Sequence, residues 1–158
     1  IANDKALAWS KSSSMLAISS DGGLVLPALG DAWESRYTHR FAGPSATNTQ
    51  RVERLLELMK PFHGEQRQAT WVEAVALADR GEILASWELK GATGVIADNP
   101  SVMPGSEGFW AFSLWRFPTL GKPYDQLTQE ERKGLGDHWT QLRTMVQEFF
   151  RNKWMQSL

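Results

Sequence analysis

The sequence predicts an α/β domain with a mixed central sheet flanked by helices. Helical and extended patterns alternate along the chain, with a long hairpin pattern over residues 69–91 and a strong helical pattern at the end. The length of 158 residues suits one domain with a substantial core, and 42% hydrophobic with 22% charged residues is ordinary for a globular protein. We therefore expect residues 1–158 to form a single domain.

Composition excludes several classes of protein. The chain has no cysteine, which excludes disulfides and thiolate metal sites. With 17 basic and 18 acidic residues, the net charge of −1 gives no reason to expect nucleic-acid binding. No apolar run approaches the roughly 20 residues that a membrane-spanning helix needs. No signal-peptide pattern is visible within the sequence either, so a cytoplasmic location is the default expectation.

The N-terminal elements are predicted from periodicity and turn residues. Residues 2–12 form a short helical pattern, and residues 15–18 form an extended one. Asp21-Gly22-Gly23 predicts a tight turn, because glycine reaches backbone angles closed to other residues. Residues 24–29 resume extended structure, although Pro27 limits them to an edge or a short strand. The polar segment 30–48 is expected to be mostly loop.

A capped amphipathic helix is predicted over residues 47–62. Thr47 or Asn48 supplies the cap, Pro61 ends the helix, and one face is apolar (Val52, Leu55, Leu56 and Met59). The hairpin follows, with strands 69–79 and 83–91 around a turn near residue 80. A further short strand within residues 94–100 and a loop over 101–108 complete this half of the chain.

The C-terminal part combines aromatic and helical patterns. Residues 109–117 read as an aromatic strand and residues 118–128 as a loop. Thr128 and Glu131 have the spacing of a capping box, and Gly134 and Gly136 interrupt the helix that it opens. The closing helix is expected over residues 137–154. Its predicted apolar side comprises Trp139, Leu142, Met145, Val146, Phe149 and Phe150.

The residues that could carry chemistry are dispersed. No glycine-rich nucleotide fingerprint, Walker loop or paired-histidine zinc motif is present, and a GxSxG nucleophile elbow is missing too. Asp21 is accompanied along the chain by separated polar and cationic residues (Arg36, Arg40, Lys122, Lys133, Asp137 and His138). One carboxylate with several cations is the layout of a phosphate-ester site. Taken one at a time, Asp21 is more typical of a plain turn than of a binding site, and the cations are typical of a solvated surface.

The order of the motifs adds to this interpretation. SDGGLVLPALG, THRFAG, RQATWVEAVAL, GVIADNP, GFWAFSLW, LGKPYDQLT and DHW before a closing helix resemble the inosine-triphosphate pyrophosphatase (Ham1/RdgB-like) family throughout. This resemblance implies Mg²⁺-dependent hydrolysis of non-standard purine nucleoside triphosphates, such as ITP, dITP and XTP, to the monophosphate and pyrophosphate. It also implies an elongated α/β fold with two lobes around a cleft, and a homodimer.

The resemblance assigns roles to residues near the phosphates. The family's Asp-Asp-Ser-Gly-Leu corresponds to residues 20–24, so Asp21 is the implied metal ligand and catalytic group, while the first aspartate and the serine are lost. The family's Ser-Ala-Arg-Tyr motif retains its arginine as Arg40, and its Gly-Lys-Thr loop retains Lys122. The implied phosphate-binding set is Arg40, Lys122, Lys133, Gly22 and Gly23.

The elements that read the base have diverged most. The implied base-binding residues are Phe109, Trp110, His138 and Trp139. Phe109 keeps the stacking position of the family's Gly-Phe-Gly-Tyr-Asp-Pro motif, but the aspartate and proline are gone. His138 is retained from Ser-His-Arg, whereas Trp139 replaces the arginine. Stacking thus replaces a bidentate hydrogen-bond donor, which predicts a shifted base preference.

The resemblance also implies that family elements are missing. Lys5-Ala6 matches the Lys-Ala of the family's first long helix, so the family's metal-binding glutamate and first strand would fall before Ile1. We expect either a piece of a longer protein or a truncated paralogue. The alternatives to an enzyme are a non-catalytic nucleotide-binding or assembly paralogue, and a scaffold whose tryptophan-rich surface forms a dimer interface.

Two further acidic residues lie on the predicted hairpin. Glu73 is in the middle of a strand, where an unpaired carboxylate is rarely buried. It either faces the cleft and replaces a lost acidic group, or faces solvent. Glu88 on the returning strand could lie on the same side, because the pairing register is open.

Overall fold

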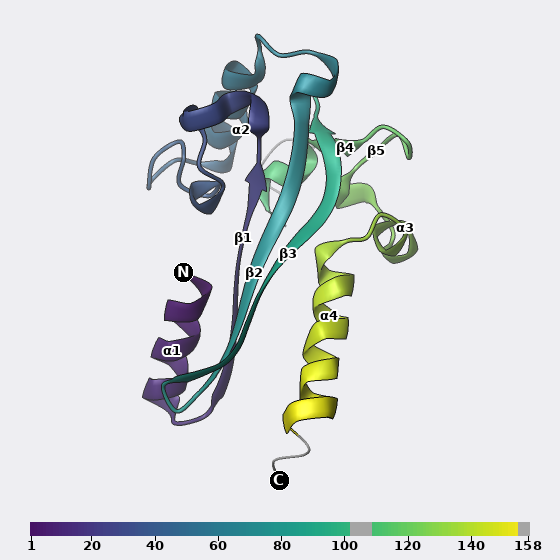
Figure 1. Ribbon diagram of the computed structural model, residues 1–158. Coiled ribbons are helices and arrows are strands. Elements are labelled where there is room, and N and C mark those ends of the chain that lie inside the picture. The colour runs from purple at the N-terminus through teal and green to yellow at the C-terminus, as the bar shows by residue number, and fades with distance from the viewer. Residues whose placement is uncertain (102–108, 155–158) are drawn as a thin grey trace. The chain divides into compact units, whose positions relative to one another are not determined.

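The computed structural model describes residues 1–101 and 109–154. Most of the predicted loop 101–108, and Gly108 of the aromatic motif, lie outside these residues. The elements are α1 (Ala2–Ser13), β1 (Leu16–Val25), α2 (Asn48–Met59), β2 (Gln68–Asp79), β3 (Glu82–Ile96), β4 (Trp115–Phe117), β5 (Lys122–Pro123), α3 (Gln129–Gly134) and α4 (His138–Phe149) (Figure 1). The α/β class is therefore confirmed.

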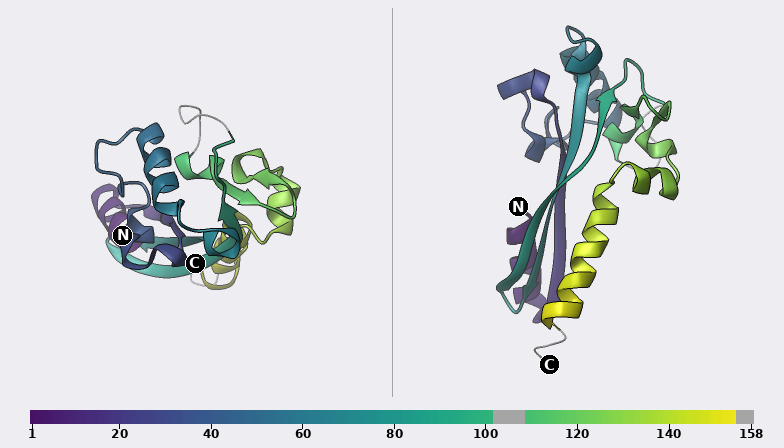
Figure 2. Two further views of the ribbon diagram at one scale, coloured as in Figure 1. Left: turned by 90° about the horizontal axis from the view of Figure 1, so that it is seen from above. Right: turned by 45° about the vertical axis from the view of Figure 1, so that its right-hand side comes forward.

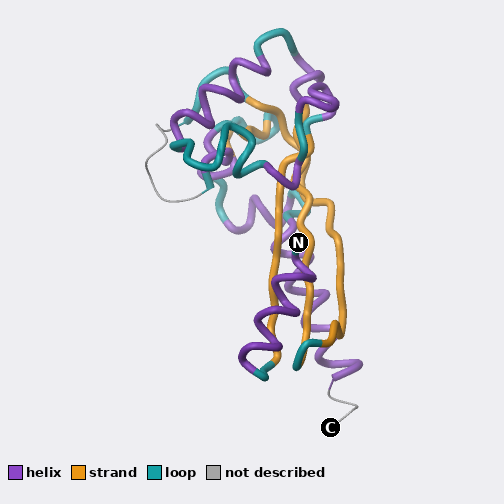
Figure 3. The backbone as a smooth tube through the Cα atoms, turned by 90° about the vertical axis from the view of Figure 1, so that its left-hand side faces the viewer, coloured by secondary structure: helices purple, strands orange, loops and turns teal. Residues whose placement is uncertain are grey.

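One five-stranded sheet has the order β1-β2-β3-β4-β5, so that strands consecutive in sequence are neighbours. β3 pairs antiparallel with β4 through Ile96 and Trp115, and β4 pairs antiparallel with β5 through Arg116 and Pro123. Figure 3 shows the long β2–β3 hairpin, whose turn contains Arg80 and Gly81 with positive φ angles of 48° and 86°. The predicted short strand within 94–100 is the end of β3.

The chain divides into two compact units. Unit 1 comprises Ile1–Gly22, Val72–Gly91 and the chain from Arg132 onward, and unit 2 comprises Gly23–Trp71 and Ala92–Glu131. Each unit is described below by itself.

Unit 1 places a helix on each face of its strands. Ala2 and Ala6 of α1 pack against Ala76 and Ala78 of β2. On the opposite face, Leu142 of α4 packs with Val75 and Leu89. Alternate residues of a strand point to opposite faces, so the even-numbered alanines of β2 face α1 and Val75 faces α4. Figure 2 shows α4 running alongside the strands.

Unit 2 has an aromatic core. Trp115, Phe117 and Trp110 are buried, and the Trp115 ring stacks on Tyr124 with centroids 4.9 Å apart. The indole nitrogen of Trp115 donates to the carbonyl of Ala69 at 3.0 Å, so its polar edge is satisfied inside the core. Helix α2 covers this unit with its buried residues Val52, Leu55 and Met59, as its apolar face predicts.

Two predicted caps are confirmed. The Thr47 hydroxyl accepts from the backbone amide of Gln50, and the Gln50 side chain accepts from the amide of Thr47. The Thr128 hydroxyl likewise accepts from the amide of Glu131, whose carboxylate accepts from the amide of Thr128. Local spacing therefore predicted both helix starts correctly.

The turn predicted at Asp21-Gly22-Gly23 is wrong, because β1 runs without a break through these residues. A Cβ atom on Gly23 would lie 2.0 Å from the carbonyl oxygen of Ser35 and 2.9 Å from the hydroxyl of Thr38. Glycine is needed here because another backbone segment approaches closely.

Three smaller expectations also differ from the structure. Residues 110–113 form a 3₁₀ turn, and the aromatic strand shrinks to β4. Helix α4 ends at Phe149 and continues as a π-helical turn over Phe150–Trp154. Trp139 was expected on the apolar side of the last helix, but its side chain is 48% exposed. No helix in the described part of the chain has the length and apolar character needed to cross a bilayer.

Candidate functional site

Asp21 lies on β1 in unit 1 and is paired with a lysine. The Lys5 ammonium donates to Asp21 Oδ1 at 2.6 Å and lies 3.4 Å from the carbonyl oxygen of Ser20. The side chains of Lys5 and Asp21 are 46% and 24% exposed, so water and ligands reach both. The pair is thus accessible, and the ammonium neutralises much of the carboxylate's charge.

The packing of α1 explains why Lys5 is beside Asp21. Ala6 is fully buried against β2, and the Ser19 hydroxyl donates to the carbonyl of Ala2. Further along the helix, the Ser10 hydroxyl accepts from the amide of Gly81. These contacts fix the helix on both sides of Lys5, which favours a reproducible position for its side chain.

The described residues do not fit a metal ion held by the protein alone. Mg²⁺ takes oxygen ligands, commonly one or two carboxylates completed by substrate phosphates and water. Within residues 1–101 and 109–154, no group of three or more His, Asp or Glu side chains is arranged to hold a metal. Asp21 offers one carboxylate with an ammonium already against it. A metal ion at Asp21 would therefore need further ligands besides this carboxylate, and substrate phosphates are one source of them.

The implied phosphate-binding cations differ in their surroundings. In unit 2, Lys122 is half-buried and its ammonium donates to Glu131 Oε1 at 2.6 Å, which lowers the pKa of the Glu131 carboxyl. Arg40 is exposed, and within the described residues no carboxylate is in ion-pair distance of its guanidinium. Lys133 is exposed on α3 in unit 1. Gly22 and Gly23 lie within β1, one in each unit.

Phe109 and Trp110 behave differently within unit 2. Phe109 is half-buried, with its ring 5.4 Å from Trp71 in an edge-to-face arrangement and 5.3 Å from Phe112. Trp110 is only 4% exposed, and its ring stacks on Phe41 with centroids 5.5 Å apart. Phe109 therefore keeps surface that a ligand can reach, whereas Trp110 supports the cluster from inside.

His39 is a neighbour of Phe109 that the sequence analysis did not select. Its side chain is exposed, and its ring lies 6.3 Å from that of Phe109 with 34° between the ring planes. The pKa of His39 is lowered, first by partial loss of hydration and then by Arg51 and Arg40. No motif marks an isolated histidine in a loop, so only the fold reveals this contact.

His138 and Asp137 begin α4 in unit 1 and are both buried. One Asp137 oxygen accepts from the amide of Trp139 and caps the helix, and the other lies 3.3 Å from His138 Nδ1. Burial, with a smaller effect of Arg132, lowers the pKa of His138 to about 4 against the opposing effect of Asp137. His138 is therefore neutral at physiological pH, and Trp139 presents the exposed ring.

The two hairpin acids occupy unlike environments in unit 1. Glu73 is 2% exposed, so the solvent-facing alternative is wrong for it, whereas Glu88 is exposed. Glu73 and Val75 are alternate residues of β2, and Val75 packs with Leu142 of α4. Glu73 therefore lies on the face of β2 that α4 covers.

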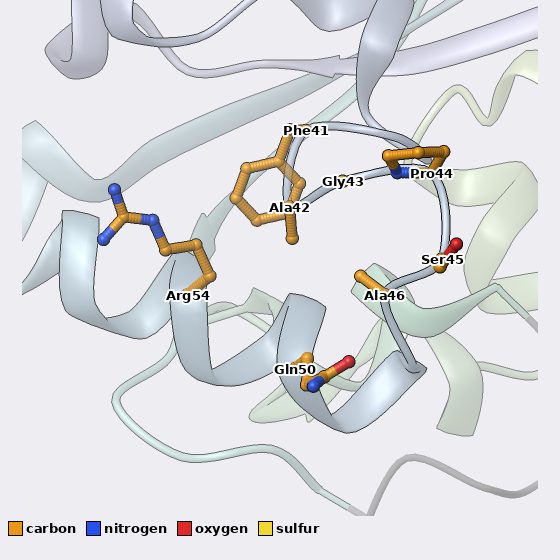
Figure 4. Close-up of a pocket in the computed structure, with 8 residues that line it drawn as sticks. All are labelled: Phe41, Ala42, Gly43, Pro44, Ser45, Ala46, Gln50 and Arg54. Atoms are coloured by element: carbon orange, nitrogen blue, oxygen red, sulfur yellow. The ribbon is translucent and has the colours of Figure 1, made fainter.

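A shallow pocket of about 530 Å³ lies in unit 2 beside α2. Figure 4 shows its lining: the loop from Phe41 to Ala46, with Gln50 and Arg54 contributed by the helix. Arg54 is paired with Glu57, and Gln50 takes part in the helix cap. The side chains of Arg54 and Gln50 thus have local partners, and none of the predicted site residues lines this pocket.

Comparisons with known proteins agree with the motif order. Residues 1–147 match the model of the Ham1 family. The chain is 30% identical over 143 residues to a dITP/XTP pyrophosphatase of Escherichia coli K12, covering 90% of this chain and 71% of that protein. The chain is also 30% identical over 143 residues to a dITP/XTP pyrophosphatase of Prochlorococcus marinus NATL1A, covering 90% of this chain and 67% of that protein.

Solved structures give the same result. A HAM1 protein from Coxiella burnetii superposes with a TM-score of 0.74 at 26% identity, covering 93% of this chain and 75% of the other. The Ham1 protein of Staphylococcus aureus superposes with a TM-score of 0.73 at 27% identity, covering 96% and 75%.

Proposed function

Since the chain belongs to the Ham1 family, we propose that it hydrolyses non-standard purine nucleoside triphosphates, such as dITP and XTP, to the monophosphate and pyrophosphate. The family match over residues 1–147 carries this proposal, and two of the relatives that support it are dITP/XTP pyrophosphatases. The accessible Asp21 carboxylate at its motif position supports it further.

We propose separate roles for the motif residues. Asp21 accepts a proton from the attacking water, because its carboxylate lies at the motif position and its side chain is 24% exposed, within reach of a ligand. Lys122, Arg40 and Lys133 neutralise phosphate oxygens, which repel a nucleophile when they are not compensated. Asp21 would hold Mg²⁺ together with oxygens of the triphosphate, and the ion would supply further neutralisation of the phosphate charge. The homodimer that the resemblance implies, and the cytoplasmic location that is the default expectation, remain part of this proposal.

The base preference is proposed to differ from that of the relatives. Trp139 is 48% exposed and offers a stacking surface in place of the hydrogen-bonding arginine of the family motif. His138 is fully buried in this chain, which favours a supporting role for it over direct base readout. We expect weaker discrimination between bases, since stacking is tolerant of base identity.

The test is pyrophosphate release from a panel of nucleoside triphosphates with Mg²⁺, using the full-length protein. We expect release from ITP or XTP, and a loss of at least about a hundredfold in kcat for Asp21→Asn, as for removal of a general base. Asp31→Asn is the matched control, because Asp31 is an exposed aspartate that belongs to no proposed site. Unchanged hydrolysis of every nucleotide by Asp21→Asn would contradict the proposed role of Asp21.

A non-catalytic nucleotide-binding or assembly paralogue is the second candidate. The Lys5–Asp21 pair favours it, because an ammonium at 2.6 Å from the carboxylate competes with a metal–nucleotide complex. This candidate predicts that nucleotides protect the protein against heat while none of them releases pyrophosphate. Pyrophosphate release above the level of the Asp21→Asn variant would exclude it.

A further inference from the structure

His39 and Phe109 leave part of their rings accessible next to each other in unit 2. Their centroids are 6.3 Å apart with 34° between the planes, His39 is exposed, and Phe109 is half-buried. Trp71 and Phe112 pack against Phe109 at 5.4 and 5.3 Å. The Phe109 ring is therefore held in place by the core, while His39 is free to adjust on the solvent side.

The spacing of these two rings is close to that of a ring sandwich. A planar ligand stacked between two rings lies about 3.5 Å from each, so the rings must be about 7 Å apart and nearly parallel. The distance of 6.3 Å falls short of this by less than one ångström. The two ring planes are 34° from parallel, so the exposed His39 side chain has to rotate both to open the gap and to align its ring with that of Phe109.

Arg51 fixes the backbone that carries His39. Its guanidinium donates to the carbonyl oxygen of His39 at 2.7 Å and to the Asn48 side chain at 2.8 Å, and it is 6% exposed. The described residues place no carboxylate within ion-pair distance of Arg51 or Arg40. The segment beside Phe109 therefore has a positive potential that an anionic ligand would neutralise.

We propose that His39 is the second wall of a slot for the planar base of a nucleotide, with Phe109 as the first wall and Arg40 and Arg51 supplying the positive potential around it. This inference rests on the proposed function, because it takes a nucleotide as the ligand. His39 contributes through stacking of its ring on the base, and so its role is specific to the base and independent of the phosphates.

The test measures affinity with two probes on the full-length protein. The probes are an ITP analogue with a non-hydrolysable α,β-methylene bridge and inorganic tripolyphosphate, each with Mg²⁺. The variants are His39→Ala and His39→Phe, with His63→Ala as the matched control, because His63 is also an exposed histidine of unit 2. We expect His39→Ala to raise the Kd for the analogue about tenfold, the usual effect of removing one stacked ring. His39→Phe should keep the affinity, and the Kd for tripolyphosphate should not change.

Each other outcome overturns the inference in a recognisable way. An unchanged Kd for the analogue in His39→Ala, while the wild type releases pyrophosphate, removes the slot and leaves the proposed function intact. An equal loss for tripolyphosphate assigns His39 to the phosphates. A wild-type protein that binds neither probe and releases no pyrophosphate overturns the slot and the proposed function together. Unchanged thermal melting of His39→Ala verifies that the variant is folded.

Discussion

His39 in unit 2 and His138 in unit 1 have pKa values lowered in the same direction but lie in opposite environments. His138 is fully buried at the start of α4, where Asp137 partly compensates the effect of burial. His39 is exposed, and two arginines with no acidic partner in the described residues add to its loss of hydration. A neutral imidazole is thus a packing element in one unit and an accessible ring in the other.

A glycine on a neighbouring strand supports each histidine. In unit 2, Gly23 lets the segment containing Ser35 and Thr38 approach β1, and the Thr38 hydroxyl accepts from the amide of Leu24 at 3.1 Å. In unit 1, a Cβ atom on Gly91 would lie 3.2 Å from both Cβ and Nδ1 of His138. The first contact involves backbone and is rigid, whereas the second involves a side chain that can shift.

The largest expected effect is that of Gly23→Ala. Its Cβ atom would lie 2.0 Å from the Ser35 carbonyl oxygen, so the segment before His39 has to move. We expect a loss of about 3 kcal/mol or more in the free energy of unfolding, measured by urea denaturation. Gly134→Ala is the control, because nothing lies within 4 Å of its Cβ position in α3 and alanine favours helices. Equal stability of the two variants would show that the segment yields easily.

The second effect separates the two histidines by pH. His138 has a folded-state pKa of about 4 against 6.5 in the unfolded chain, so the unfolded state takes up the proton first. Its contribution is therefore intact above about pH 6.5 and is lost at about 1.4 kcal/mol per pH unit as the pH falls towards 4. Urea denaturation should give a wild-type stability about 2 kcal/mol lower at pH 5 than at pH 7.5 from this group.

The variant His138→Asn isolates that contribution. It should be less stable than the wild type at pH 7.5, because it leaves a cavity beside Gly91. Its free energy of unfolding should, however, differ much less between pH 5 and pH 7.5 than that of the wild type. His39→Ala should lose only a minor part of the wild-type dependence, because its side chain is exposed and its lowered pKa contributes less. A pH dependence that is the same in His138→Asn and the wild type would mean that other groups cause it.

Gly91→Ala should have a smaller effect. A contact of 3.2 Å with a side chain requires a shift of a few tenths of an ångström at the start of α4. We expect a destabilisation of about 1 kcal/mol by urea denaturation, because the strain exceeds the entropy that alanine removes from the unfolded chain. A stabilised variant would indicate that the start of α4 can move away from β3 at little cost in free energy.

The smallest expected effect is the coupling free energy between Lys5 and Asp21, an accessible ion pair in unit 1. Their exposed fractions of 46% and 24% predict a coupling of about 0.5 kcal/mol in a double-mutant cycle with Lys5→Met and Asp21→Asn. The coupling should fall further in 1 M NaCl, because salt screens accessible charges. A coupling free energy above about 2 kcal/mol would show that the Lys5–Asp21 pair behaves energetically as a buried pair and not as an accessible one.

Local signals accounted for most of the secondary structure. The two helix caps, the apolar face of α2 and the turn of the β2–β3 hairpin depend on residues that are close in sequence, and all are confirmed. The turn at Asp21 failed because a segment 12 residues away requires the glycine there. Trp139 was misplaced because helical periodicity alone did not reveal that His138 occupies the buried position.

The candidate site was less predictable than the fold. The motif order identified the family, which is confirmed, and selected Asp21 and Phe109 by position. The Lys5–Asp21 pair joins residues 16 positions apart, and the neighbour of Phe109 at His39 is 70 positions away. Contacts of this kind arise from tertiary packing, which a pattern within one segment does not predict.

The distribution of tryptophans gives the protein a built-in optical label for each unit. Trp9 and Trp139 of unit 1 are 68% and 48% exposed, whereas unit 2 buries its indoles (Trp33, Trp71, Trp110 and Trp115). Iodide in solution will therefore quench Trp9 and Trp139 of unit 1 first, and the blue edge of the spectrum will come mainly from the buried indoles of unit 2, with a share from the half-buried Trp87 of unit 1. Ligand titrations and denaturation curves read at these two wavelengths can follow the units separately in unlabelled protein.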